Sequence, residues 1–207
     1  MLVKIETKQA MSEVALIKKM MEDSRKIYIN NGIHYIFWGV LVTVALLTNY
    51  LLLLTKTAGK YVGLMWLILM VCGGIIDGFI GRRQEKQAKA HTFAGNVLGS
   101  LWMASGISMF IFGFFGTISG AYNPIFVCPV ISTSLGLSYY TSGVLQQIKW
   151  LQYISIGWWI GGALLFIFPS IHTLLIFAIM IICFQIIPGM ILSSKAKQEQ
   201  ESEAPII

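Results

Sequence analysis

Two ionisable residues within apolar stretches are the first candidates for chemistry. Asp77 is the one acidic residue inside any apolar run of the chain, and His34 lies at the start of the first run. A carboxylate at a bilayer centre costs about 2.5–3.5 kcal/mol on insertion scales, so such a residue usually has a partner. Asp77 and His34 lie near the ends of their runs, at about the same depth. We expect a hydrogen-bonded pair that titrates near neutral pH; proton coupling and a structural tie between two helices both fit it.

A second candidate is a face of small hydroxyl side chains. Ser134, Ser138, Thr141 and Ser142 follow i, i+4, i+7 and i+8, so they share one side of a helix. In lipid this face must point toward other helices or a wet space. Such residues commonly join packed helices, and the alternative is a substrate path that also includes Gln185 of the last run.

Motifs of enzymes and metal sites are missing from the sequence. It has no glycine-rich phosphate loop, no Gly-x-Ser-x-Gly and no His-Glu-x-x-His. All three cysteines lie inside apolar runs, and no two of the three histidines are placed as axial haem ligands. We therefore expect a protein without enzymatic activity, metal or cofactor.

The composition is that of an integral membrane protein. Hydrophobic residues make up 56% of the 207 residues and charged residues 12%. A soluble domain has about 45–50% apolar and about 25% charged residues, so too few charges are present to cover a soluble surface. The net charge of +6 does not indicate nucleic-acid binding, because the basic residues flank apolar runs as membrane insertion requires.

Six apolar runs, each about as long as the roughly 30 Å hydrocarbon core requires of a helix, predict the fold. We expect an all-α, polytopic bundle of six transmembrane helices, because strands of a membrane barrel would be half as long. The runs are Ile33–Leu54, Tyr61–Ile80, Val97–Ile118, Ile125–Gln146, Trp150–Phe168 and Thr173–Leu192.

The distribution of positive charge predicts the orientation. Thirteen of the fifteen Lys and Arg residues fall on one side of this threading, and only Lys56 and Lys60 fall on the other. Because cytoplasmic loops carry the excess of Lys and Arg, both termini are expected in the cytoplasm of a bacterial cell. Residues 1–32 form a cytoplasmic lead with an amphipathic helix, residues 33–192 the membrane domain, and residues 193–207 a disordered tail.

Expected partners follow from the same pattern. The bilayer itself is the first, and a basic loop could bind anionic lipid head groups at about 1 kcal/mol per residue. Gly74-x-x-x-Gly78 and Gly157-x-x-x-Gly161 permit close helix packing, within the bundle, in a homo-oligomer or with another membrane protein. The basic residues of the loop are Arg82, Arg83, Lys86 and Lys89.

Two segments resemble a group of small bacterial membrane proteins with six spans and no established activity. The first is Ile17-Lys-Lys-Met-Met-Glu-Asp-Ser-Arg-Lys26, followed by Gly32 and by Trp38-Gly39 in an apolar run. The second is Gln185-Ile-Ile-Pro-Gly189, similar to the last helix of that group, which often has His where this chain has Gln185. The resemblance implies a polytopic bacterial protein and no particular activity.

These observations favour a non-enzymatic accessory or sensing component of the inner membrane. The alternative is a small proton-coupled transporter or channel subunit that uses Asp77 and His34. The absence of a catalytic motif and the short outer loops favour the first interpretation.

Overall fold

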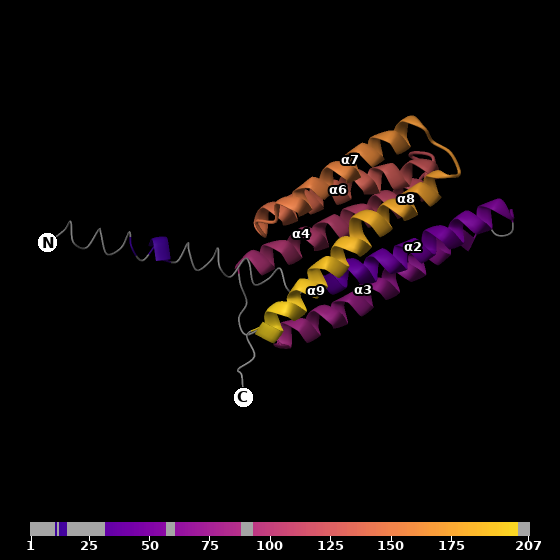
Figure 1. Cartoon of the computed structure of the whole chain (residues 1–207). Coiled ribbons are helices and arrows are strands. Elements are labelled where there is room, and N and C mark those ends of the chain that lie inside the picture. Colours follow the sequence, from indigo (N-terminus) through magenta and orange to yellow (C-terminus); the bar gives the residue numbers. More distant parts are fainter. Residues whose placement is uncertain (1–10, 12, 16–31, 57–60, 88–92, 203–207) are drawn as a thin grey trace.

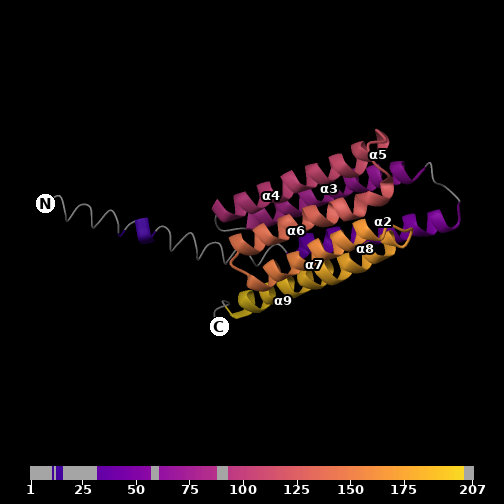
Figure 2. The ribbon, with the colours of Figure 1, turned by 90° about the horizontal axis from the view of Figure 1, so that it is seen from above.

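The computed structural model describes residues 11, 13–15, 32–56, 61–87 and 93–202, and all regular structure in these ranges is helical. The helices run side by side, up and down, as one elongated bundle (Figures 1 and 2). The amphipathic helix that we expected between Met11 and Ile29 falls mostly outside the described residues.

Five helices or helical rods are long and apolar enough to cross a membrane: Gly32–Leu54, Val62–Gln84, Gly95–Ile118, Lys149–Ile167 and Thr173–Lys195. Two of these rods contain a π-helical turn. The elements in chain order are α2 (Gly32–Leu54), α3 (Val62–Gln87), α4 (Phe93–Phe110), η2 (Ile111–Phe115), α5 (Gly116–Ile118), η3 (Pro124–Phe126), α6 (Val127–Leu145), α7 (Lys149–Ile167), α8 (Thr173–Ile181), η4 (Ile182–Ile186) and α9 (Ile187–Ser202).

The fourth apolar run forms α6, which is long enough but not apolar enough to count among the five candidate spans. Several of its polar residues do not face outward. Ser132, Ser138, Tyr139 and Ser142 have no exposed surface, so α6 is surrounded by other helices for much of its circumference. A helix in this position does not need an apolar surface of its own, because neighbouring helices separate its hydroxyl groups from lipid.

α6 and α7 form the tightest helix pair of the bundle. They are joined by a turn in which Gln147 has a positive φ of 57° and the Ile148 N–H donates to the Gly143 carbonyl at 2.8 Å. Small residues let the two backbones approach: a Cβ added to Gly143 would lie 2.8 Å from the Gln152 nitrogen. The Ser132 hydroxyl also donates to the Trp158 carbonyl, at 2.6 Å.

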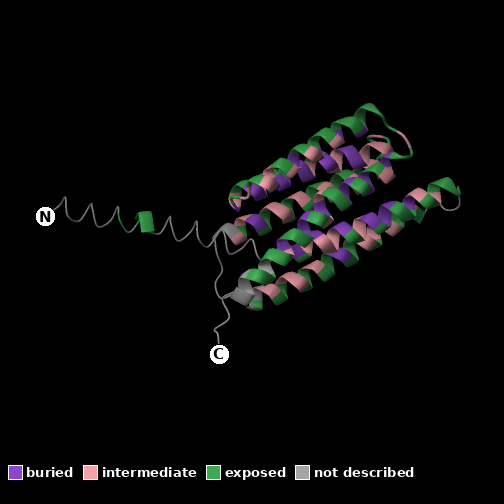
Figure 3. Cartoon of the chain, in the orientation of Figure 1, coloured by how far each residue is buried: buried purple, intermediate pink, exposed green. Residues whose placement is uncertain are grey.

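The core lies along α2, α6, α7 and the α8–η4–α9 rod, whereas α3 and α4 are mostly exposed (Figure 3). Among the described helices, α3 packs extensively only against α2. The two Gly-x-x-x-Gly motifs therefore differ. Gly157 and Gly161 pack against Phe184 and Met180, while added Cβ atoms at Gly74 and Gly78 would meet nothing within 4 Å.

The helix ends differ from the predicted boundaries at two places. α3 continues to Gln87, so Arg82, Arg83 and Lys86 lie on a helix and not in a loop. α9 continues to Ser202, through most of the segment that we predicted to be a disordered tail. Lys, Gln and Glu are good helix formers, and Lys195 and Lys197 each precede a Glu by four residues, which favours continuation of the helix.

Candidate functional site

The expected pair of His34 and Asp77 is present between the first turn of α2 and the second half of α3. His34 Nδ1 lies 2.5 Å from Asp77 Oδ1, and the side chains are 25% and 28% exposed. A third residue completes the contact: His34 Nε2 lies 2.9 Å from Gln84 Oε1. Asp77, Gly81 and Gln84 follow i, i+4 and i+7, so one face of α3 meets the imidazole. We call this group the His34 cluster.

Hydrogen bonding in the His34 cluster favours the charged imidazole. Both ring nitrogens face oxygen atoms, and the carboxylate of Asp77 can only accept a hydrogen bond. Only the imidazolium form donates from both nitrogens at once. In the neutral form one nitrogen becomes an acceptor, so the Gln84 amide would have to turn its NH₂ group toward the ring. The arrangement is therefore sensitive to a single proton.

Glycines of α3 face α2 within the cluster and one turn before it. A Cβ added to Gly81 would lie 3.9 Å from His34 Cε1. Farther along the same face, a Cβ at Gly73 would lie 2.6 Å from Leu41 and 3.2 Å from the Trp38 ring. The imidazole and the indole thus rest against positions of α3 that have no side chain.

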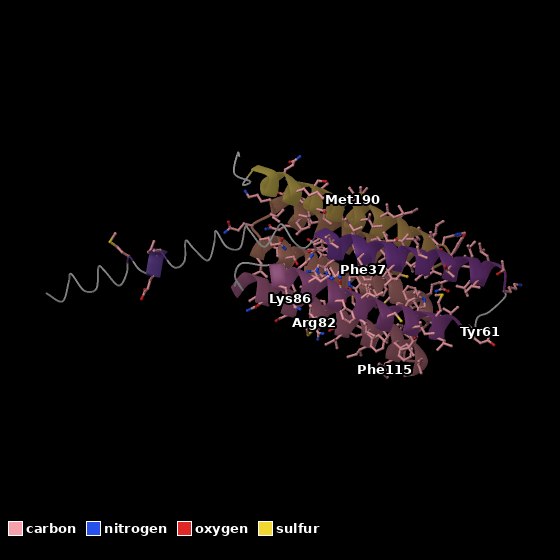
Figure 4. The ribbon with its side chains drawn as sticks, turned by 90° about the horizontal axis from the view of Figure 1, so that it is seen from below. Phe37, Tyr61, Arg82, Lys86, Phe115 and Met190 are labelled. Atoms are coloured by element: carbon pink, nitrogen blue, oxygen red, sulfur yellow. The ribbon has the colours of Figure 1, made fainter. Side chains whose placement is uncertain are left out.

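Exposed cations follow the His34 cluster at the end of α3. Arg82 and Lys86 lie toward the end of the bundle opposite Tyr61 (Figure 4), and both are exposed, as is Arg83. Within the described ranges, the contact of His34 with Asp77 is the only ion pair, so these three cations are available to other anions. Lys89 lies outside the described residues.

The hydroxyl face of α6 divides between two roles. Ser138 donates to Ser105 Oγ at 2.8 Å, and Trp102 Nε1 donates to Ser142 Oγ at 3.1 Å; both contacts join α6 to α4. Ser134 and Thr141 are half-buried and donate to carbonyls of their own helix, those of Val130 and Leu137. Helix packing therefore accounts for Ser138 and Ser142, and the structure does not bring these hydroxyls to the His34 cluster.

Gln185 lies in the π-helical turn η4 and is buried. Its Nε2 donates to the Tyr35 carbonyl at 3.3 Å. This hydrogen bond joins the last rod to α2 at the residue that follows His34. The turn directly precedes Pro188, which has no N–H to donate, and a π turn is one way to accommodate the freed carbonyl groups. Gln185 thus lies behind the helix that carries His34 and makes no contact with Asp77.

Sequence reasoning missed Gln84, Tyr35, Tyr139 and Gln146. Gln84 could have been found from its i+7 spacing to Asp77 if the helix had been extended beyond Ile80. Tyr35, Trp102 and Tyr139 form a trio of rings whose centroids are 5.3–5.6 Å apart. Aromatic residues are frequent in this chain, so nothing in their spacing distinguished these three from the rest.

The remaining histidines lie elsewhere. His172 Nδ1 lies 3.0 Å from the Tyr50 hydroxyl at the opposite end of α2, and His91 is outside the described residues. In the part of the chain that the structure describes, no three His, Cys, Asp or Glu side chains come together as a metal site.

No protein-family model matches this sequence, and no curated protein or solved structure resembles it closely enough to count as a match. The functional argument therefore depends on the geometry of the chain itself.

Proposed function

We propose that this chain is a non-enzymatic sensing component of a bacterial inner membrane, with six spans and both termini in the cytoplasm. In this proposal the His34 cluster senses protonation and transmits it by holding or releasing α3. The observation that carries the proposal is that both imidazole nitrogens face oxygen atoms of α3, at 2.5 and 2.9 Å.

The packing of α3 supports this role. Among the described helices, α3 packs extensively only against α2, and the polar contacts described between these two helices are those of the His34 cluster. Loss of the proton would weaken both hydrogen bonds at once, so the helix would depend more on the apolar contact around Gly73 and Trp38. A helix with one extensive partner can shift with little change to the core along α6 and α7.

The cationic end of α3 supports anionic lipid as a partner. Arg82, Arg83 and Lys86 lie within three turns after Asp77, and positive side chains beside a membrane attract anionic head groups. A change in the position of α3 would therefore move these cations relative to the lipid head groups. The predicted side for this end of the bundle is the cytoplasmic one, since most of the basic residues cluster there.

Spin-label distances test the proposal directly. Labels at the exposed positions Val44 on α2 and Ile75 on α3 would be introduced after replacing the exposed Cys72 and Cys183 with alanine. We expect the distance distribution in liposomes to broaden as the pH rises from about 5 to 8, the range in which histidine titrates. Asp77→Asn should give the broad distribution at every pH.

A matched label pair on α6 and α7, at the exposed residues Leu137 and Ile160, serves as the control and should not respond to pH. If the Val44–Ile75 distribution is the same throughout this range, α3 is not released and the sensing role fails. Equal broadening of both pairs would instead mean general loosening of the bundle and would also contradict the proposal.

A small proton-coupled transporter is the second candidate. The specific observation in its favour is an ionisable pair that lies between two candidate spans. Proton uptake into proteoliposomes, followed with an enclosed pH-sensitive dye, tests this function without a known substrate. Uptake that depends on the protein and is abolished by Asp77→Asn would favour transport over sensing.

A further inference from the structure

Three buried polar side chains converge beneath the cationic end of the bundle without hydrogen-bond partners. Tyr35, Tyr139 and Gln146 are 5%, 0% and 3% exposed. Among the described residues, neither tyrosine hydroxyl nor either polar atom of the Gln146 amide has a hydrogen-bond partner. Each such atom costs about 1–3 kcal/mol if it stays unpaired, and nearly all buried polar atoms in proteins are paired.

These side chains form one cluster across three helices. The Tyr35 hydroxyl lies beside the polar groups of Trp102, Ser142 and Gln146 but outside hydrogen-bond geometry with any of them. The Tyr35 and Tyr139 rings lie 5.3 Å apart, and the Trp102 ring stands edge-on to both. Trp102 already donates to Ser142, which leaves the hydroxyls and the amide as the groups that need a partner.

The chemistry of the cluster selects an uncharged partner. A hydroxyl donates and accepts, and an amide has one group of each kind, so the cluster offers both roles. None of its members carries a formal charge, and the neighbouring His34 is engaged on the other side of α2 by Asp77. A buried ion would therefore lose its hydration without gaining a counter-charge, which is strongly unfavourable.

We propose that Tyr35, Tyr139, Ser142 and Gln146 bind a small neutral molecule that both donates and accepts hydrogen bonds. Water is the smallest molecule of this class, and a solute of the size of urea or acetamide is the other source. The cluster lies close to an aqueous surface, because Tyr35 is in the first turn of α2 and Gln146 directly follows α6. The site shares no side chain with the His34 cluster, so this inference goes beyond the proposed function and stands independently of it.

A double-mutant cycle with a matched control tests the site. Tyr35→Phe and Gln146→Met remove polar atoms of neighbouring groups with little change in volume, so the variants should still fold. If a molecule bridges the two groups, each variant lowers the unfolding midpoint in detergent and the double variant loses less than the sum. Tyr153→Phe is the control, because Tyr153 lies on α7 with 67% of its surface exposed and should not change the midpoint.

Additive effects of the two substitutions, or higher midpoints in both variants, would overturn the proposal, since they mean that no shared partner is lost. A density map that resolves ordered water distinguishes a bridging molecule from a direct hydrogen bond between the two side chains. A peak between Tyr35 and Gln146 that disappears in Gln146→Met supports the site, and a direct side-chain hydrogen bond without such a peak refutes it.

Exchange into solute-free buffer distinguishes the two sources. Non-additivity of the two substitutions that persists after exhaustive dialysis identifies water as the bound molecule. Non-additivity that is lost on dialysis and restored by added urea or acetamide identifies a solute.

Discussion

Gly32 and Gly189 meet backbone to backbone where α2 crosses α9. A Cβ added to Gly32 would lie 2.7 Å from the Gly189 carbonyl oxygen, and one added to Gly189 would lie 3.0 Å from the Gly32 oxygen. This contact fixes the first turn of α2, and therefore fixes both His34 and Tyr35 relative to the last rod of the bundle.

Replacing Gly189 with alanine should separate the two helices. The new methyl would also lie 2.9 Å from Tyr35 Cβ, so the backbones must move apart. We expect a loss of about 1–3 kcal/mol in the free energy of unfolding, as for other overpacked sites. Unfolding in mixed micelles measures it. Gly78→Ala is the control: its methyl meets nothing within 4 Å, and an equal loss there would show that the effect is general.

The contact of α2 with α3 should be more stable in acid than in base. Both hydrogen bonds of His34 use N–H donors, so they are complete only when the ring is protonated and are weakened as the proton leaves. The stability difference between the native chain and His34→Gln should therefore shrink as the pH rises from about 5 to 8. A difference that grows over this range would mean that the neutral ring makes the better contact.

Gln84→Glu should extend the contact to higher pH. A carboxylate opposite Nε2 would give the imidazolium a second anionic acceptor, in addition to Asp77. In the spin-label experiment, broadening of the α2–α3 distance should begin at a higher pH than in the native chain. Gln84→Leu is the matched opposite, and it should broaden the distribution at lower pH. Identical profiles for the two variants would exclude Gln84 from the switch.

Attachment of α4 to α6 should depend modestly on the Ser105–Ser138 hydrogen bond. Interhelical hydrogen bonds in membrane proteins average about 0.6 kcal/mol, so Ser138→Ala should cost about that much. Equilibrium unfolding of Ser105→Ala, Ser138→Ala and the double variant gives the coupling energy. Ser108→Ala is the control, since Ser108 is exposed and donates only to a carbonyl of its own helix.

Crossing of the membrane by α6 can be tested at the two ends of that helix. Ser119 and Gln147 are exposed residues that precede and follow it. In a chain without Cys72 and Cys183, a membrane-impermeant maleimide should label Ser119→Cys and Gln147→Cys from opposite sides. Labelling of both positions from the same side would mean five spans or fewer. The orientation predicted for every helix after α6 would then be reversed.

Much of this architecture could be predicted from the sequence. Long apolar runs mark helices wherever lipid surrounds them, and the His34–Asp77 contact follows from two ionisable residues at matching helix ends. The sequence-based prediction was incomplete where polar residues continue a helix beyond the apolar run. Gln84 was missed for that reason, because the charges of Arg82 and Arg83 suggested a loop.

Inward and outward faces could not be predicted in the same way. In a soluble protein the apolar face points inward, but here lipid and core are both apolar, so hydrophobicity does not distinguish them. Gly74 and Gly157 belong to the same type of motif, yet only Gly157 is in contact with another helix. For the same reason the buried tyrosines, Tyr35 and Tyr139, could not be separated from exposed ones such as Tyr153.

The tight turn between α6 and α7 has a consequence for biogenesis. A segment with fully buried hydroxyl groups partitions poorly into lipid by itself, whereas α7 can cover the Ser132 side of α6 as soon as both have been synthesised. We expect the two to leave the translocon as a single helical hairpin. A nascent chain ending shortly after Gln146 should therefore leave α6 outside the bilayer, and glycosylation mapping of truncated chains would detect the delay.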